Sequence, residues 1–217
     1  SLRQKGGLSG FLNREESEHD AFTTGHAGAS VSTALGMASG KRLLASFKKI
    51  PSGRPRKVVA VIGDASLVNG MAFEAMNHAG HLREDLIVIL NDNDMSISPT
   101  VGAISSYLNK IISHPLYNHL REDMGALLRK IPRIGKKVAV KAKKFDEGLK
   151  NLLVPGLLFE ELGFKYFGPI DGHDTGKLIE ILGNLARMPG PMLLHVVTKK
   201  GKGYEMAEKE PSRWHAA

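Results

Sequence analysis

Three short runs of mostly apolar residues, rich in Val, Ile and Leu, stand out in the chain, at 58–62, 86–90 and 191–198. Each run is continuous rather than alternating, which is typical of a parallel strand buried on both faces. After the first run, apolar residues recur at Met71, Ala75 and Ala79, and this fourth-residue spacing predicts a helix over 69–82. The order strand, helix, strand predicts a βαβ unit with a right-handed crossover.

The remaining segments complete the predicted architecture. Small residues predict a helix over 29–40, and apolar spacing predicts helices over 157–162 and 178–186, with a short strand at 165–167. Residues 1–20 are rich in Gly and polar residues and predict a loop. Alternating strands and helices in 217 residues predict one α/β domain, with a mostly parallel sheet and helices on both faces.

Two basic stretches carry much of the net charge of +8, at 41–57 and 129–150. Pro and Gly among the basic residues of 41–57 predict an exposed connection, which we interpret as a surface insertion. Residues 110–150 have no regular pattern and predict an irregular basic segment, either mobile or helical. The sequence leaves open whether this segment lies near the mouth of an active site or is only a solvated face.

Composition disfavours several classes of function. Neither basic stretch interleaves aromatic residues for base stacking, so we expect no nucleic-acid partner, and the basic charge fits a solvated surface or a phosphate-rich ligand. The absence of Cys excludes disulfides, thiolate metal sites and a Cys nucleophile, and it fits a cytosolic protein. No apolar run approaches the roughly 20 residues of a membrane span, so no membrane partner is expected.

Candidate chemistry lies where two predicted strands end. Gly63 and Asp64 follow the first apolar run, and Asn91-Asp92-Asn93 follows the second after an interval of 26 residues. Ligands of open α/β sheets bind outside the carboxyl ends of strands, so Asp64 and Asn93 are expected to converge. A carboxylate and an amide oxygen suit Mg²⁺, and a helix beginning after Asp64 would receive phosphate. Taken alone, the same residues also fit a helix N-cap and a turn.

Gly-Asp followed at this distance by Asn resembles the thiamine-diphosphate signature of transketolases and related enzymes. The flanking text resembles the 1-deoxy-D-xylulose-5-phosphate synthase family in particular, in order along nearly the whole chain. The segments that carry this resemblance are 3–8, 70–80, 88–98, 154–156, 159–164, 168–174, 198–204 and 207–209. The resemblance implies a thiamine-diphosphate-binding fold, with residues 1–217 as one partial diphosphate-binding domain.

The resemblance also implies a metal and diphosphate site. Asp64 and the side-chain oxygen of Asn93 would bind Mg²⁺, together with the backbone carbonyl of Met95. Ala65 and Ser66 would hold diphosphate oxygens through N–H or hydroxyl groups.

Two further segments would contact the organic part of the cofactor. The turn formed by Gly25, His26 and Ala27 would line thiamine diphosphate, with His26 near the thiazolium and the substrate, assisting proton transfer. Tyr204 would close over the cofactor. Taken alone, Gly-His in a turn is also consistent with a purely structural role.

The implied activity is that of a transketolase-type transferase. It would condense pyruvate with glyceraldehyde 3-phosphate, with loss of carbon dioxide, using thiamine diphosphate and Mg²⁺. The product would feed isoprenoid-precursor, thiamine and pyridoxal synthesis. The complete protein would be a homodimer of the bacterial cytoplasm, with a plastid left open because the chain has no initiator Met and looks cut from a longer protein.

Parts of the implied enzyme fall outside this sequence. An upstream cofactor-facing His would precede residue 1, and the pyrimidine-binding and C-terminal domains, with the glutamate that activates the aminopyrimidine, would follow residue 217. The segment alone is therefore expected to be inactive.

Two departures from the family pattern keep alternatives open. The family usually has Gly where this chain has Ala65, which costs on the order of 1 kcal/mol if φ is positive and nothing if φ is negative. Residues 41–57 also look longer than the usual connection. A non-catalytic or decayed thiamine-diphosphate-binding module, supported only by Ala65, is one alternative. A different thiamine enzyme is another, and residues 90–96 and 172–174 argue against it.

Overall fold

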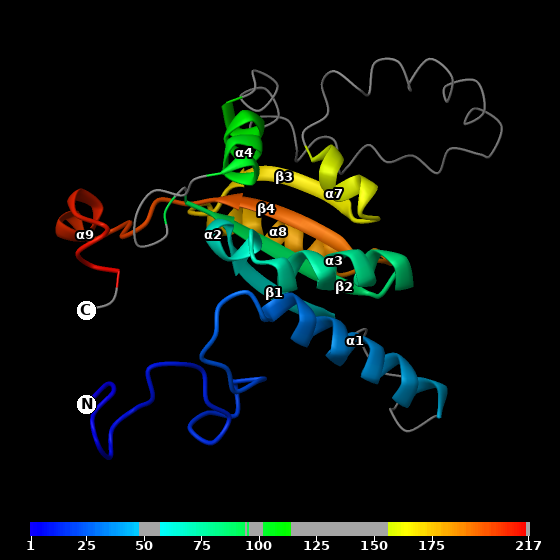
Figure 1. Ribbon diagram of the computed structural model, residues 1–217, viewed down its shortest axis with the longest axis horizontal. Helices are drawn as coiled ribbons and strands as arrows, with labels where there is room; N and C mark the ends of the chain where they lie inside the picture. The colour runs from blue at the N-terminus through cyan, green and yellow to red at the C-terminus, as the bar shows by residue number, and fades with distance from the viewer. Residues whose placement is uncertain (48–56, 94, 96–101, 114–155, 216–217) are drawn as a thin grey trace.

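A computed structural model describes residues 1–47, 57–93, 95, 102–113 and 156–215 (Figure 1). Its centre is a four-stranded sheet in the order β1-β2-β4-β3, with every neighbouring pair parallel. The strands are β1 (Val58–Gly63), β2 (Leu86–Asp92), β3 (Lys165–Asp171) and β4 (Met192–Val197). The predicted α/β class and the predicted parallel βαβ unit are both confirmed.

Helices pack on both faces of the sheet. They are α1 (Ser30–Ser46), α2 (Asp64–Leu67), α3 (Gly70–Leu82), α4 (Ala103–Ser113), α7 (Leu157–Glu161), α8 (Thr175–Leu185) and α9 (Glu205–Lys209). Buried side chains of α1, α3, α4 and α7 form a larger core with one face of the sheet. Side chains of α8 form a smaller core with the other face, against β2, β3 and β4. None of the helices that the structure describes has both the length and the apolar character to cross a bilayer.

Helix α3 ends at Leu82 as predicted and begins at Gly70, one residue later than predicted. The side chain of Asn69 accepts a hydrogen bond from the N–H of Met71 at 3.0 Å, which caps the first turn. Arg83 adopts a left-handed conformation (φ 52°) and ends the helix. Gly80 packs against the backbone of Leu162, where a Cβ would lie 1.7 Å from the carbonyl oxygen. A glycine at this point therefore lets α3 approach the turn after α7.

Strand β1 differs from its prediction, because it is buried on one face only. Val59 and Val61 are 47% and 60% exposed. Their neighbours Ala60 and Ile62 point to the opposite face and are buried. Within the described residues β1 lies at the edge of the sheet, and the core beneath α8 includes no residue of β1. The apolar run identified a strand correctly but did not reveal that one face would stay uncovered.

Helix α1 and strand β3 extend furthest beyond their predicted ends. Helix α1 continues to Ser46, so residues 41–46 are helical instead of part of an exposed connection. Strand β3 continues to Asp171 beyond the predicted 165–167, because pairing with β4 resumes after a register shift between Phe167 and Ile170. The shift accommodates Pro169, which has no N–H to donate to a strand ladder.

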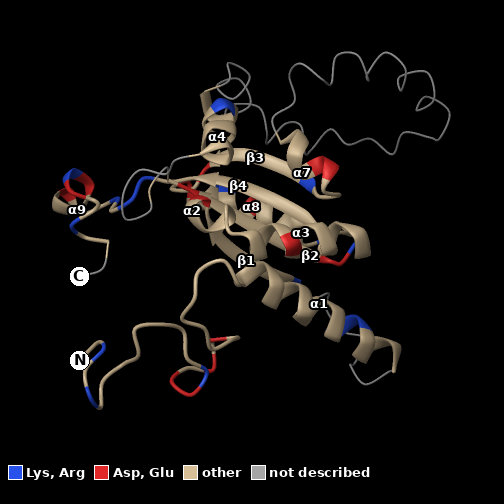
Figure 2. Cartoon of the chain, in the orientation of Figure 1, with Lys and Arg blue, Asp and Glu red and all other residues tan. Residues whose placement is uncertain are grey.

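The two basic stretches are described only in part. Residues 48–56 and 114–155 lie outside the described residues, so the predictions for most of 41–57 and of 110–150 are not tested. Helix α4 covers residues 103–113, and the start of the segment expected to be irregular is therefore helical. In the described part, basic residues and acidic residues are both scattered over several helices and loops (Figure 2).

Candidate cofactor and metal site

The ends of β1 and β2 bring Asp64 and Asn93 together. Gly63, the last residue of β1, is the register partner of Asn91 in β2, so both chains leave the sheet at the same edge. The N–H of Asn93 donates a hydrogen bond to Oδ1 of Asp64 at 3.5 Å. Asp64 is only 5% exposed, which means that its carboxylate is held within the edge of the fold. The convergence expected from strand topology is present.

The side chain of Asn93 is fixed by a local turn. Its Oδ1 accepts a hydrogen bond from the N–H of Met95 at 3.0 Å. An amide oxygen has two lone pairs, so this bond leaves capacity for a second partner. A carboxylate, an amide oxygen and a main-chain carbonyl are the hard oxygen donors that Mg²⁺ prefers, and the donor set at this edge fits that ion.

The site does not depend on a cluster of acidic or imidazole groups. Among the described residues, no three or more His, Cys, Asp or Glu side chains gather in a way that could hold a metal ion. The candidate ligands comprise one carboxylate and neutral oxygens. A magnesium ion bound through one or two carboxylates usually completes its shell with phosphate oxygens and water, which matches this composition.

Ala65 and Ser66 occupy the first turn of α2, directly after Asp64. Gly63 is the N-cap residue and is extended (φ −77°, ψ 157°), with no side-chain capping bond at the helix start. The first N–H groups of a helix have no partner within it. Arg3 and Arg83 are the only described non-glycine residues with positive φ, so Ala65 has negative φ and carries no backbone strain.

The turn formed by Gly25, His26 and Ala27 is exposed and leads into α1. Gly28, which follows it, has φ +85°, and a Cβ there would lie 2.7 Å from Nδ2 of Asn69. Because Asn69 caps α3, this close approach holds the turn beside the starts of α1 and α3. The N–H of His26 is 3.5 Å from Oγ1 of Thr24.

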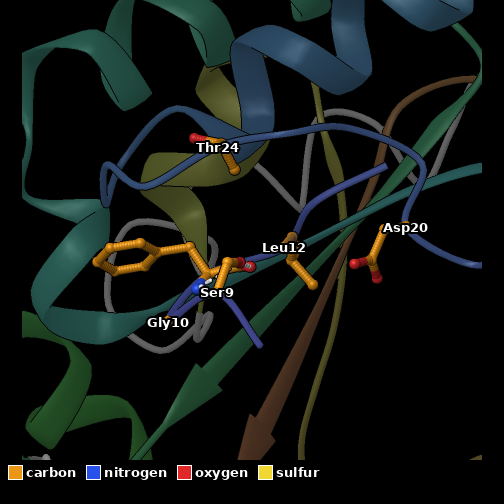
Figure 3. A pocket seen from close by; sticks show the side chains of 6 residues that line it. Ser9, Gly10, Leu12, Asp20 and Thr24 are labelled. Carbon is orange, nitrogen blue, oxygen red and sulfur yellow. Dashed lines mark hydrogen bonds between the residues drawn. The ribbon is translucent and has the colours of Figure 1, made fainter. Parts of the chain in front are cut away.

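The segment before this turn folds back on it and leaves a hollow of about 450 Å³ (Figure 3). Leu12 and Thr24 form an antiparallel bridge. The ring of Phe11 packs closely against Gly25, and a Cβ added at Gly25 would lie 3.2 Å from that ring. The hollow is lined by Ser9, Gly10, Phe11, Leu12, Asp20 and Thr24. It adjoins the His26 turn and does not include Asp64 or Asn93. A second hollow of about 410 Å³ lies between α1 and α3.

Tyr204 lies in the segment between β4 and α9, at the same end of the sheet as α2 (Figure 1). It is 49% exposed. Its ring packs edge-on against Trp214, with 5.2 Å between centroids, and its hydroxyl donates to Sδ of Met206 at 3.2 Å. These contacts are with the C-terminal segment rather than with the strand ends.

Glu208 ties this segment together. The hydrogen bond from the Lys199 ammonium lowers the pKa of the Glu208 carboxyl below its usual range, and a bond from the N–H of Gly203 lowers it further. The Gly203 bond is 2.9 Å long. The Glu208 carboxylate therefore joins Lys199 and Gly203, which lie on the turn before Tyr204.

Sequence reasoning did not single out the buried partners of the Asn91–Asn93 segment. Nε2 of His195 in β4 lies 2.9 Å from Oδ2 of Asp92, and Nδ1 of His195 lies 2.8 Å from the hydroxyl of Tyr166 in β3. Thr198 donates from Oγ1 to Oδ1 of Asn91 at 2.8 Å. The sequence did contain one indication of these contacts. His195 is a single polar residue inside an otherwise apolar strand, and a buried polar group needs a hydrogen-bond partner.

Comparisons with known proteins agree with this picture. The model of the family described as 1-deoxy-D-xylulose-5-phosphate synthase matches residues 1–198. The 1-deoxy-D-xylulose-5-phosphate synthase of Syntrophomonas wolfei is 52% identical over 99% of this chain, which covers 32% of that protein. The protein of the same name from Natranaerobius thermophilus is also 52% identical, over 99% of this chain and 33% of its own length. The chain thus spans about a third of the curated relatives that it matches.

Among solved structures, transketolase from Campylobacter jejuni has a TM-score of 0.54 to this chain, at 21% identity. The likeness covers 87% of this chain and 23% of the transketolase, and at this identity it shows a shared fold. The family match is the more specific finding, because it covers most of the chain and agrees with relatives of about half identity. This chain belongs to the 1-deoxy-D-xylulose-5-phosphate synthase family.

Proposed function

We propose that the protein containing this chain is a 1-deoxy-D-xylulose-5-phosphate synthase. It condenses pyruvate with glyceraldehyde 3-phosphate, with loss of carbon dioxide, and depends on thiamine diphosphate and Mg²⁺. The observation that carries the proposal is the meeting of Asp64 and Asn93 at one edge of the sheet, in a chain 52% identical to a protein of that name.

In this proposal the strand ends hold the diphosphate end of the cofactor. Asp64, the side chain of Asn93 and the backbone carbonyl of Met95 bind Mg²⁺. The first turn of α2 supports this role, because Ala65 and Ser66 follow the buried carboxylate directly and present helix-start N–H groups. These N–H groups would donate to the oxygens of a bound diphosphate.

The reacting end of the cofactor belongs to the loops. Gly25, His26 and Ala27 line it, and Tyr204 closes over it. Thiamine diphosphate, when bound, supplies the carbon that attacks pyruvate and the electron sink for loss of carbon dioxide. The exposed imidazole of His26 gives or takes a proton at the substrate, which is the usual role of His near neutral pH.

The proposal also covers the oligomeric state of the complete protein, its location and the use of its product. The synthase works as a homodimer in the cytoplasm, without a nucleic-acid or membrane partner, and its product feeds isoprenoid-precursor, thiamine and pyridoxal synthesis. The alternative of a decayed binding module was supported only by Ala65. The negative φ of that residue removes this support, because Ala fits a helical turn without strain.

A donor assay on the complete protein tests the proposal. The protein, with thiamine diphosphate and Mg²⁺, is offered glyceraldehyde 3-phosphate together with either pyruvate or a ketose phosphate. We expect product and carbon dioxide from pyruvate alone, and loss of turnover after chelation that added Mg²⁺ restores. Turnover of the ketose phosphate instead would make the protein a transketolase, and no turnover with either donor would revive the non-catalytic reading.

A further inference from the structure

A row of polar side chains crosses three neighbouring strands beneath the candidate metal site. Tyr166 in β3, His195 in β4 and Asp92 in β2 are linked by contacts of 2.8 Å and 2.9 Å, both through the imidazole ring. His195 is 0% exposed and lies amid the apolar core. An imidazole at this depth persists only when both ring nitrogens are satisfied, because an unpaired buried polar group is costly.

For a neutral imidazole, the partners of His195 assign which group in the row donates. The Asp92 carboxylate accepts hydrogen bonds, so Nε2 of His195 carries a proton and donates to it. In the neutral ring Nδ1 is then the acceptor, and the Tyr166 hydroxyl donates to Nδ1. The ring of Tyr166 is in turn stacked on Phe159, with 5.8 Å between centroids and 3° between planes. Each member is therefore oriented by the next.

Asp92 lies between Asn91 and Asn93, and it is held at two points by β4 and by the residue that follows β4. His195 binds its carboxylate from one face of the sheet, and the N–H of Thr198 donates to its backbone carbonyl at 2.8 Å. Asn93 follows immediately, with its N–H directed at Asp64. Because the side chain and the backbone carbonyl of Asp92 are both held, the backbone from which the amide oxygen of Asn93 projects is anchored next to Asn93.

We propose that His195 is a positioning residue for the metal site: by holding Asp92, with Tyr166 behind it, it sets where Asn93 presents its oxygen to a divalent cation. The inference rests on the proposed function, since it requires a cation at Asp64 and Asn93. Groups that orient metal ligands without touching the metal commonly matter for affinity, and their replacement typically weakens binding by about 10- to 100-fold.

The test measures metal binding in the complete protein, independently of turnover. Mn²⁺ serves as the probe, and its free electron-paramagnetic-resonance signal is titrated with protein in the presence of thiamine diphosphate. We expect His195→Phe, which keeps a ring but no polar atoms, to raise the Mn²⁺ dissociation constant by about 10-fold or more. His195→Gln keeps a donor for Asp92 and should restore most of the affinity, while Tyr166→Phe should give an intermediate loss.

Leu194→Val is the matched control, since Leu194 is equally buried in β4 but faces the core beneath α8. It should lower the melting temperature of the metal-free protein without changing the Mn²⁺ dissociation constant. If His195→Phe folds, a Mn²⁺ dissociation constant equal to that of Leu194→Val overturns the inference. If His195→Phe does not fold, Tyr166→Phe decides the matter, and a dissociation constant of Tyr166→Phe equal to that of Leu194→Val overturns the inference. Wild-type protein that binds no Mn²⁺ would instead refute the proposed metal site itself.

Discussion

The two halves of the proposed site are built in different ways. The residues for metal and diphosphate lie on strand ends, where a parallel ladder sets their positions, and Asp64 is 5% exposed. The residues for the reacting end lie on surface segments, and Tyr204 is 49% exposed, with its ring against Trp214. The first half is fixed by the fold of this chain alone. The second is fixed only by short turns and by close packing of a few residues.

This difference shows which structural features fix the positions of the site residues. At the strand ends, Gly63 and Asn91 are register partners. A slip of β1 by one residue against β2 would turn the buried side chains of β1 to the opposite face of the sheet, so the register is strongly fixed. Around His26, the fixed points are the close approach of Gly28 to Asn69 and of Gly25 to Phe11. Loops carried on a rigid scaffold commonly supply reactive groups, and the two halves fit that division of labour.

The largest expected effect comes from removing the buried carboxylate. In the complete protein, Asp64→Ala should lower Mg²⁺-dependent turnover by more than about 100-fold, because a direct ligand matters more than the groups that merely orient ligands. The measurement is turnover with pyruvate over a range of Mg²⁺ concentrations. Asp85→Ala is the control, since Asp85 is an exposed carboxylate just before β2, at the opposite end of the sheet. Retained turnover in Asp64→Ala would refute the site.

A smaller effect is expected in the loop half. His26→Ala should lower kcat by about 100-fold, the lower range for loss of a general acid or base, and leave the Mg²⁺ half-saturation constant unchanged. His19→Ala removes another exposed imidazole from the same segment and should have no effect on either quantity. A raised half-saturation constant with normal kcat would show that the two halves are not separable.

The smallest effect is expected at Ala65. Because its φ is negative, Ala65→Gly should leave thiamine-diphosphate affinity unchanged and lower the free energy of unfolding by about 0.5–1 kcal/mol, the usual cost of glycine in a helix. Calorimetric titration and urea denaturation of the complete protein measure the two quantities. A tenfold gain in affinity would mean that Ala65 distorts the diphosphate site after all.

Local patterns were enough to predict most elements and the convergence of Asp64 with Asn93. Strand runs and the α3 periodicity are properties of neighbouring residues, and parallel strands necessarily end at one edge. The burial of β1 was mispredicted because edge position depends on the whole sheet. The partners of His195 were missed for a similar reason, since Asp92 lies 103 residues away in the chain and Tyr166 lies 29 away.

The uncovered edge of the sheet has a practical consequence for work with these 217 residues in isolation. Along β1, the outward side chains Val59 and Val61 stand beside backbone N–H and C=O groups that have no strand partner among the described residues on that side. An apolar edge strand of this kind is a template for pairing with another copy. Concentrated preparations of the isolated segment should therefore precipitate or grow into β-rich aggregates. Val61→Lys should delay this aggregation, because a charged side chain on an edge strand disfavours pairing with another copy.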